Sequence, residues 1–116
     1  MRTSQLFFAL VLASSALMAQ TITTSEAAKH IGQRETVCGT IAGVHTAASS
    51  RGTPTFINLD RAYPDQIFTL LIWGEDRARV GAVPKSGRIC ATGIIKEYRG
   101  APEIVLRDAD SWYVPK

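Results

Sequence analysis

The sequence is poor in cysteine and histidine, and neither sign of charge dominates it. Its 116 residues include two cysteines and two histidines, and the CxxC and HxxxH spacings that preorganise zinc ligands are missing. The formal net charge of +3 is a mild basic bias, whereas a protein dedicated to duplex nucleic acid carries a strong excess. We therefore expect no metal site, and the charge alone does not identify a partner.

The sequence also lacks the patterns of common catalytic sites. The segment "RVGAVPKSG" does not have the GxxxxGK[ST] spacing of a phosphate-binding loop. His30 and His45 have no Ser or Cys nucleophile motif beside them. Carboxylates are numerous, but the Arg and carboxylate array of a metal-dependent nuclease cannot be placed on them. We expect a non-enzymatic protein without a cofactor, and a metal-dependent nuclease is the alternative.

The first residues have the pattern of a secretory signal peptide. Arg2 precedes "LFFALVLASSALMA", an apolar run that is too short to span a bilayer and that ends in small residues. No charged stop-transfer flank follows this run, which disfavours a retained membrane anchor. We predict a signal peptide over residues 1–19 with cleavage after Ala19, or alternatively after Ala16. The protein is then expected to be periplasmic or secreted, with no stable membrane span after cleavage.

Export determines what the two cysteines are expected to do. Cys38 and Cys90 would enter an oxidising compartment, where pairing is the default. The alternative is a metal site that uses both thiols together with His30 or His45. Because the usual ligand spacings are missing, the sequence favours a disulfide between Cys38 and Cys90.

The segment after the predicted cleavage site has the features of a short helix. "TTSEAAKHIGQ" contains Thr and Ser as capping candidates, an acidic residue in the first turn, helix-favouring alanines, and Gly32 as a stop. We predict an N-terminal helical segment over residues 20–34, which packs on a domain formed by residues 35–116.

From Glu35 onwards the apolar residues recur with a period of two, which is typical of strands. Five segments share this pattern: "ETVCGTIAGVHT", "TFINLD", "IFTLLIW", the run that begins at Arg88, and "PEIVLRD". The connection "GEDRARVGAVPKSG" predicts a short helix or an irregular crossover. The side chains expected to point inward are Val37, Ile41, Ile57, Leu59, Phe68, Leu70, Ile72, Ile89, Ile95, Ile104 and Leu106.

Five short strands leave two exposed edges when they form an open sheet, so closure into a small barrel is expected. Gly39 and Gly93, inside strands, mark positions where a coiled strand bends. The order of three strands, a crossover and two strands is that of the OB-fold, which binds oligonucleotides and oligosaccharides. We predict an all-β fold: a five-stranded Greek-key OB-fold barrel with a short N-terminal helix.

Two longer stretches point to a family. "TFINLDRAYPDQIFTLLIW" followed by "GRICATGIIKEYRGAPEIVL" resembles the nucleic-acid-binding OB-fold family, in the branch related to anticodon-binding OB domains and to accessory OB modules of secreted bacterial nucleases. The likeness covers roughly Glu35 to Asp110 and depends on the patterns "V.G.I", "F.NL" and "G.I..Y.G.PEI". The chain departs from these relatives because it carries no nuclease or synthetase domain, which leaves the ligand open.

The resemblance implies a binding face. In that family the aromatic residue at the position of Phe56 stacks on a base and Asn58 lies in the same row, and the resemblance extends to Tyr98 and Arg99. Trp73 is a further stacking candidate. The remaining candidates are cations that would follow phosphates: Arg51, Arg61 and Lys96.

Each aromatic candidate also has a purely structural alternative. Phe56 then covers the barrel mouth, Trp73 packs under the crossover, and Tyr98 braces a hairpin. The chain between the last two strands contains Tyr-Arg-Gly-Ala-Pro, and we expect a loop longer than a bare turn there. "EYRGAP" is expected to form one wall of a groove and "ASSRGT" the opposite wall.

These features favour an exported, non-enzymatic OB-fold module that binds single-stranded DNA or RNA with little sequence specificity. The alternative is a periplasmic OB domain in which the same aromatics bind a protein or a glycan, for example a secreted nuclease as the protein partner. Phosphate contacts release counterions, so the salt dependence of binding separates the two hypotheses.

Overall fold

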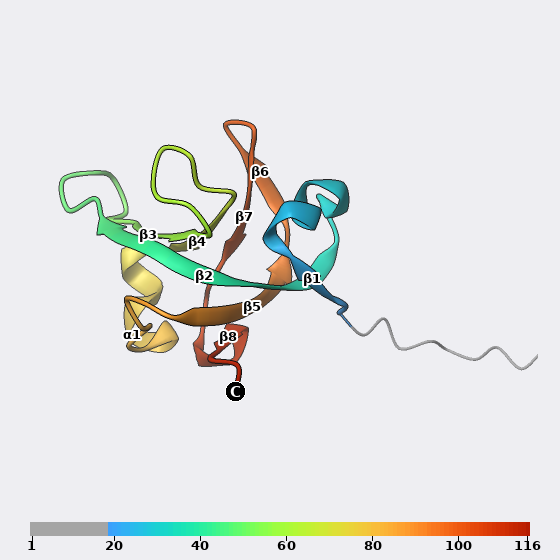
Figure 1. Ribbon diagram of the computed structural model, residues 1–116. Helices are drawn as coiled ribbons and strands as arrows, with labels where there is room; N and C mark the ends of the chain where they lie inside the picture. The colour runs from blue at the N-terminus through green and yellow to red at the C-terminus, as the bar shows by residue number, and fades with distance from the viewer. Residues whose placement is uncertain (1–18) are drawn as a thin grey trace, which may run out of the picture.

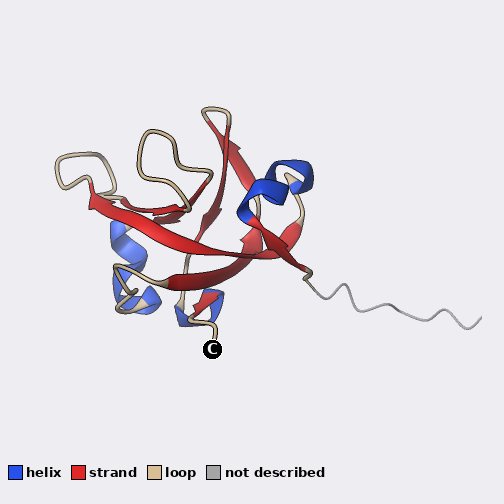
Figure 2. Cartoon of the chain, in the orientation of Figure 1, coloured by secondary structure: helices blue, strands red, loops and turns tan. Residues whose placement is uncertain are grey.

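The computed structural model describes residues 19–116. The predicted signal peptide lies outside this part of the chain, apart from its last residue, Ala19. Within the described residues, no helix is both long enough and apolar enough to cross a membrane. The described chain is mostly strand and forms one curled, barrel-like sheet with short helices around it (Figures 1 and 2).

The helices and strands alternate along the chain in short segments. The strands are β1 (Thr21–Thr23), β2 (Arg34–Thr46), β3 (Thr55–Leu59), β4 (Phe68–Ile72), β5 (Arg88–Ile94), β6 (Lys96–Tyr98), β7 (Ala101–Val105) and β8 (Trp112–Tyr113). The helical segments are the 3-10 helices Thr24–His30, Gly74–Asp76 and Ala109–Ser111, and the α-helix α1 (Arg77–Val80).

The sheet has the order β6-β7-β4-β3-β2-β5-β8, and β1 pairs with β2. The long strand β2 pairs with β5 through its first half and with β3 through its second half. β5 and β6 are separated only by Ile95. This segment bends, so that β5 pairs with β2 near one end of the sheet and β6 forms the strand at the other end. This arrangement curls the sheet around a single core.

The prediction of five strands is wrong in number, because the sheet has eight. The expected fourth strand divides at Ile95 into β5 and β6. The short strands β1 and β8 were not expected, since three and two residues are too few to show a period. β8 is held in place where the Trp112 indole N–H donates to the backbone oxygen of Val80 at 2.8 Å.

All of the side chains expected to point inward are buried. The largest of them, Phe68, lies on β4 in the middle of the sheet order. The prediction of the core is therefore confirmed, because alternate residues of a strand must face the same side of the sheet.

The predicted N-terminal helix is present as the 3-10 helix Thr24–His30, and Gly32 after it has a φ of 85°. At its start, the Thr23 hydroxyl and backbone N–H both donate to Glu26 Oε1, at 2.8 and 3.1 Å. These hydrogen bonds hold the pKa of the Glu26 carboxyl below its ordinary value, with smaller contributions from His30 and Lys29. Ala27 is buried and fixes the helix against the sheet.

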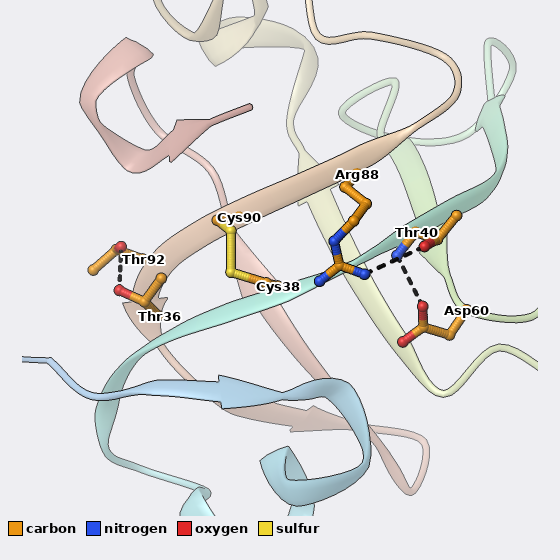
Figure 3. Close-up of a disulfide and its surroundings, with 7 residues drawn as sticks. All are labelled: Thr36, Cys38, Thr40, Asp60, Arg88, Cys90 and Thr92. Atoms are coloured by element: carbon orange, nitrogen blue, oxygen red, sulfur yellow. Dashed lines mark hydrogen bonds between the residues drawn. A yellow bond between two sulfur atoms is a disulfide. The ribbon is translucent and has the colours of Figure 1, made fainter. Parts of the chain in front are cut away.

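The predicted disulfide is confirmed. Cys38 on β2 lies directly opposite Cys90 on β5, with 4.0 Å between their Cα atoms, and the two sulfurs are bonded (Figure 3). Both sulfurs are used in this bond, so the alternative of a metal site built on both thiols is wrong. Two residues along the same register, the hydroxyls of Thr36 and Thr92 lie 2.7 Å apart.

Candidate functional site

A groove of about 800 Å³ lies on the outer face of the sheet. Its floor comes from β2, β3, β4 and β7, and its walls come from two connections between strands. The residues that line it are His45, Ala47, Phe56, Asn58, Tyr63, Pro64, Gln66, Thr69, Tyr98, Arg99, Ala101, Pro102 and Glu103.

Strand register explains why the floor residues meet. Asn58 on β3 lies opposite Thr69 on β4, and Thr69 lies opposite Glu103 on β7. Residues opposite one another point to the same side of a sheet, so these three side chains form a row across three strands. Asn58 and Thr69 are buried, and the Thr69 hydroxyl donates to Asn58 Oδ1 at 3.4 Å.

The aromatic part of the groove comes from three rings. Phe56 on β3 is half-buried and lies opposite His45 on β2. Tyr98 and Tyr63 are far more open, with 54% and 75% of their surface exposed. Exposed rings of this size beside a groove provide flat surfaces on which a planar ligand can stack.

One wall of the groove is the β6–β7 hairpin. Tyr98 ends β6 and Ala101 begins β7, so Arg99 and Gly100 alone form the turn, with φ values of 51° and 81°. Two central residues with positive φ are typical of a type I′ turn, which matches the twist of the strands. The expectation of a longer loop is therefore wrong. The "EYRGAP" segment does contribute a wall, but mainly through its strand residues.

The other wall is not the one expected. Residues 48–53, "ASSRGT", contribute no lining residue, and the connection between β2 and β3 provides only Ala47. The opposite wall is the β3–β4 connection with Tyr63, Pro64 and Gln66, and it projects from the same end of the sheet as the β6–β7 hairpin (Figure 1).

A contact with Trp73 explains where the β2–β3 connection goes. Gly52 lies so close to this indole that a Cβ on Gly52 would be 2.9 Å from Trp73 Cε3. The backbone N–H of Gly74 donates to the backbone oxygen of Gly52 at 2.8 Å. The connection is thereby fixed at the end of β4, away from the groove.

The structure brings together half of the predicted binding residues: Phe56, Asn58, Tyr98 and Arg99 line the groove. Trp73 lies outside it, half-buried against Gly52. The other predicted residues that lie outside it are the exposed cations Arg51, Arg61 and Lys96. Lys96 instead lines a smaller hollow of about 350 Å³, together with Arg34 and Arg107.

Several lining residues were missed from the sequence. Glu103 and Thr69 could have been found, because they share the outward side of their strands with Asn58 once the register is known. Tyr63 and Gln66 lie in "RAYPDQ", the connection between the segments "TFINLD" and "IFTLLIW". Binding residues are found disproportionately on loops, so the aromatic Tyr63 in this connection was the available signal.

The charges in the groove are few. Burial raises the pKa of the Glu103 carboxyl above its ordinary value, and the nearby Lys96 acts in the opposite direction. Among residues 19–116, the single ion pair joins Arg79 to Asp76, which lie outside the groove. The same residues contain no group of three His, Cys, Asp or Glu side chains arranged to hold a metal ion. The groove can therefore stack planar groups and offer hydrogen bonds, with Arg99 and His45 as its basic side chains.

Comparisons with known proteins bear on the fold. No family model matches the chain, and the search of curated proteins gave no significant match. Among solved structures, a putative aspartyl-tRNA synthetase from Leishmania major Friedlin is similar, with a TM-score of 0.55 and 11% identity. The match covers 89% of this chain and 22% of the synthetase chain. At this identity the likeness concerns the fold alone, and it is to part of a much longer protein.

Proposed function

We propose that the chain is an exported, non-enzymatic OB-fold module that binds single-stranded nucleic acid in the groove. The strand pairing supports the OB assignment. β2, β3 and β4 are consecutive antiparallel neighbours, β7 pairs parallel with β4, and β5 returns to β2. OB-folds bind oligonucleotides and oligosaccharides on the face of their second and third strands, which here are β3 and β4.

The observation that carries the proposal is the presence of three aromatic rings in one open groove on this face. Phe56, Tyr63 and Tyr98 all line it. A base stacked on an aromatic side chain contributes about 1–3 kcal/mol, and every base has a face that can stack. Binding of this kind is expected to tolerate different sequences.

The electrostatics set the expected strength. Arg99 is the only Arg or Lys among the lining residues, and Glu103 opposes it in sign. Each phosphate contact on a single strand contributes roughly 0.7 to the slope of log affinity against log salt. We therefore expect weak binding with a shallow salt slope, equivalent to one or two phosphates.

The same paucity of cations favours a second candidate, a protein or glycan partner. Pro64, Pro102 and Ala101 give the groove apolar patches, and aromatic rings stack on sugars as well as on bases. Such binding has no counterion release, so its affinity is expected to change little with salt. A secreted nuclease is the kind of protein partner that the sequence resemblance suggests.

The proposal is tested by fluorescence anisotropy with a short labelled oligothymidylate at low and at physiological salt. We expect measurable binding that weakens with salt and that Phe56→Ala reduces by about 1–3 kcal/mol. Tyr113→Ala is the control, because Tyr113 is an exposed aromatic at the other end of the sheet order. Absence of binding by the wild type at low salt would count against nucleic acid and favour the protein or glycan partner.

We also propose export to the periplasm or beyond the cell. The signal-peptide pattern of residues 1–19 supports this, and so does the disulfide, because disulfides persist in oxidising compartments. Cell fractionation followed by N-terminal sequencing tests it. A mature protein that begins at Gln20 is the expected result, and cytoplasmic protein with an intact N-terminus would contradict it.

A further inference from the structure

A row of polar side chains crosses the floor of the groove. Asn58, Thr69 and Glu103 lie opposite one another on three adjacent strands, and Lys96 on β6 lies opposite Glu103 at the end of the row. Adjacent strands are about 4.8 Å apart, so the row spans about 10 Å from Asn58 to Glu103. The edge of a base that is stacked beside the row can reach the side chains of the row.

Aromatic rings lie on both sides of this polar row. β3 and β6 run in the same direction, because β3 is antiparallel to β4, β4 is parallel to β7, and β7 is antiparallel to β6. Phe56 precedes Asn58 by two residues on β3, whereas Tyr98 follows Lys96 by two residues on β6. The register therefore places Phe56 on one side of the row and Tyr98 on the other, so that a base stacked on either ring has an edge toward the row.

Two acceptors at the row, the Glu103 carboxylate and Gln66 Oε1, receive no hydrogen bond within the described residues, although the Asn58 amide and the Lys96 ammonium are donors in the same row. Among residues 19–116, no ion pair or side-chain hydrogen bond involves the Glu103 carboxylate: the single ion pair is Arg79 with Asp76, and the side-chain bond in the row joins Thr69 to Asn58. Oε1 of Gln66, in the groove wall, is buried and has no hydrogen-bond partner. A buried acceptor without a donor costs free energy until a ligand supplies the donor.

A carboxylate distinguishes the bases by the hydrogen-bond donors that each base carries. Thymine and uracil have one ring N–H and no amino group, and adenine and cytosine have an amino group beside a ring acceptor. Guanine carries a ring N–H and an amino group side by side on one edge, and these two donors match the two oxygens of a carboxylate. Phosphates, in contrast, are repelled by a carboxylate, so a base rather than a phosphate is expected beside Glu103.

We propose that the groove holds one guanine preferentially, with the Glu103 carboxylate accepting two parallel hydrogen bonds from the guanine N1–H and 2-amino group. This inference rests on the proposed function and adds to it a preference at one base position. The raised pKa of Glu103 is consistent with a poorly solvated carboxylate that gains from two donors.

The test compares three labelled oligonucleotides that differ at one central position of an oligothymidylate: thymidine, guanosine, or inosine, which lacks the 2-amino group. We expect the guanosine oligonucleotide to bind the wild type about fivefold more tightly than the thymidine one, and inosine to be intermediate. Glu103→Gln is expected to make the guanosine and thymidine oligonucleotides bind equally well. Glu97→Gln, an exposed neighbour outside the groove, is expected to retain it.

The outcomes separate the two proposals. Equal binding of all three oligonucleotides by the wild type, or an unchanged preference in Glu103→Gln, would overturn the guanine site and leave the nucleic-acid proposal standing. No binding of any of them would overturn both. Circular dichroism of each variant establishes that a lost preference does not reflect a lost fold.

Discussion

The guanidinium carbon of Arg99 lies 5.2 Å from the centre of the Tyr98 ring, although the two residues are neighbours in the chain. At this distance the cation is attracted to the face of the ring. The positive φ values of Arg99 and Gly100 reverse the chain within two residues, so both side chains stay at the rim of the groove. Under the proposed function, the hairpin presents a ring for stacking and a charge for phosphate together.

Replacement of this charge should change the salt dependence of binding. We expect Arg99→Ala to lower the slope of log affinity against log salt by roughly 0.7, the share of one phosphate on a single strand. Arg51→Ala is the matched control, because Arg51 is an exposed arginine whose connection is directed away from the groove. The assignment fails if anisotropy titrations at several salt concentrations give both variants the wild-type slope.

The unexpected wall of the groove gives a second prediction. Tyr63 lines the groove from the β3–β4 connection and is 75% exposed, so Tyr63→Ala removes a stacking surface and little of the core. Binding of single-stranded DNA should weaken by about 1–3 kcal/mol, with the thermal midpoint nearly unchanged. If affinity matches that of the control Tyr113→Ala, the β3–β4 connection is not part of the site.

The disulfide should contribute strongly to stability. Cys38 and Cys90 are 52 residues apart in the chain, and the loop-entropy relation gives roughly 4 kcal/mol for a crosslink of this span. In urea denaturation, the double variant Cys38→Ser/Cys90→Ser is expected to have a free energy of unfolding that is lower than that of the wild type by about this amount. The wild type in reducing agent provides the comparison, and unfolding curves that do not differ between oxidised and reduced protein would contradict the prediction.

The Glu103 carboxyl should make the stability depend on pH in a known direction. Its pKa in the folded protein is raised above the ordinary value of 4.5, so the folded state holds this proton more tightly than the unfolded chain does. The ionised Glu103 carboxylate destabilises the folded state, and this cost is fully present above the raised pKa. Protonation of the carboxyl removes the cost, so this group favours folding as the pH falls. The basic side chain opposite Glu103 is Lys96, on the neighbouring strand and outside the groove, and the basic side chains in the groove are His45 and Arg99.

Glu103→Gln should accordingly be more stable than the wild type at neutral pH. The difference should shrink as the pH falls through the raised pKa and should be lost below 4.5, where the wild-type carboxyl is protonated in both states. Urea midpoints at neutral and at acidic pH measure this difference, with Glu97→Gln as the exposed control. A variant that is less stable than the wild type at neutral pH would show that the Glu103 charge is satisfied in the fold.

The core was predictable because it depends on local information. Alternation along β3 and β4 places Ile57 and Leu59, then Phe68 and Leu70, on the inner side without any knowledge of the partner strands. The disulfide was predictable because the chain has only two cysteines. Both predictions follow from the order of residues and not from the three-dimensional path of the loops.

The groove was only partly predictable, because its walls depend on tertiary contacts. The β2–β3 connection is held by Trp73 packing on Gly52, and nothing local to "ASSRGT" indicates that contact. Arg99 in a left-handed turn is also difficult to foresee, since Asn and Asp occupy this position more readily. Glu103 appears as part of the site only when the parallel pairing of β7 with β4 places it beside Thr69.

The bond between Cys38 and Cys90 divides the groove into two covalently distinct parts. Residues 38–90 form a closed ring that carries Phe56, Asn58 and the Tyr63 wall, whereas Tyr98 and Glu103 belong to the tail that follows the ring. A protease cut after Cys90 would detach the tail half of the groove and leave the ring linked. A ligand bound in the groove contacts both the ring and the tail, and so holds the tail against the ring. Occupancy of the groove should therefore protect the tail from digestion more than it protects the ring.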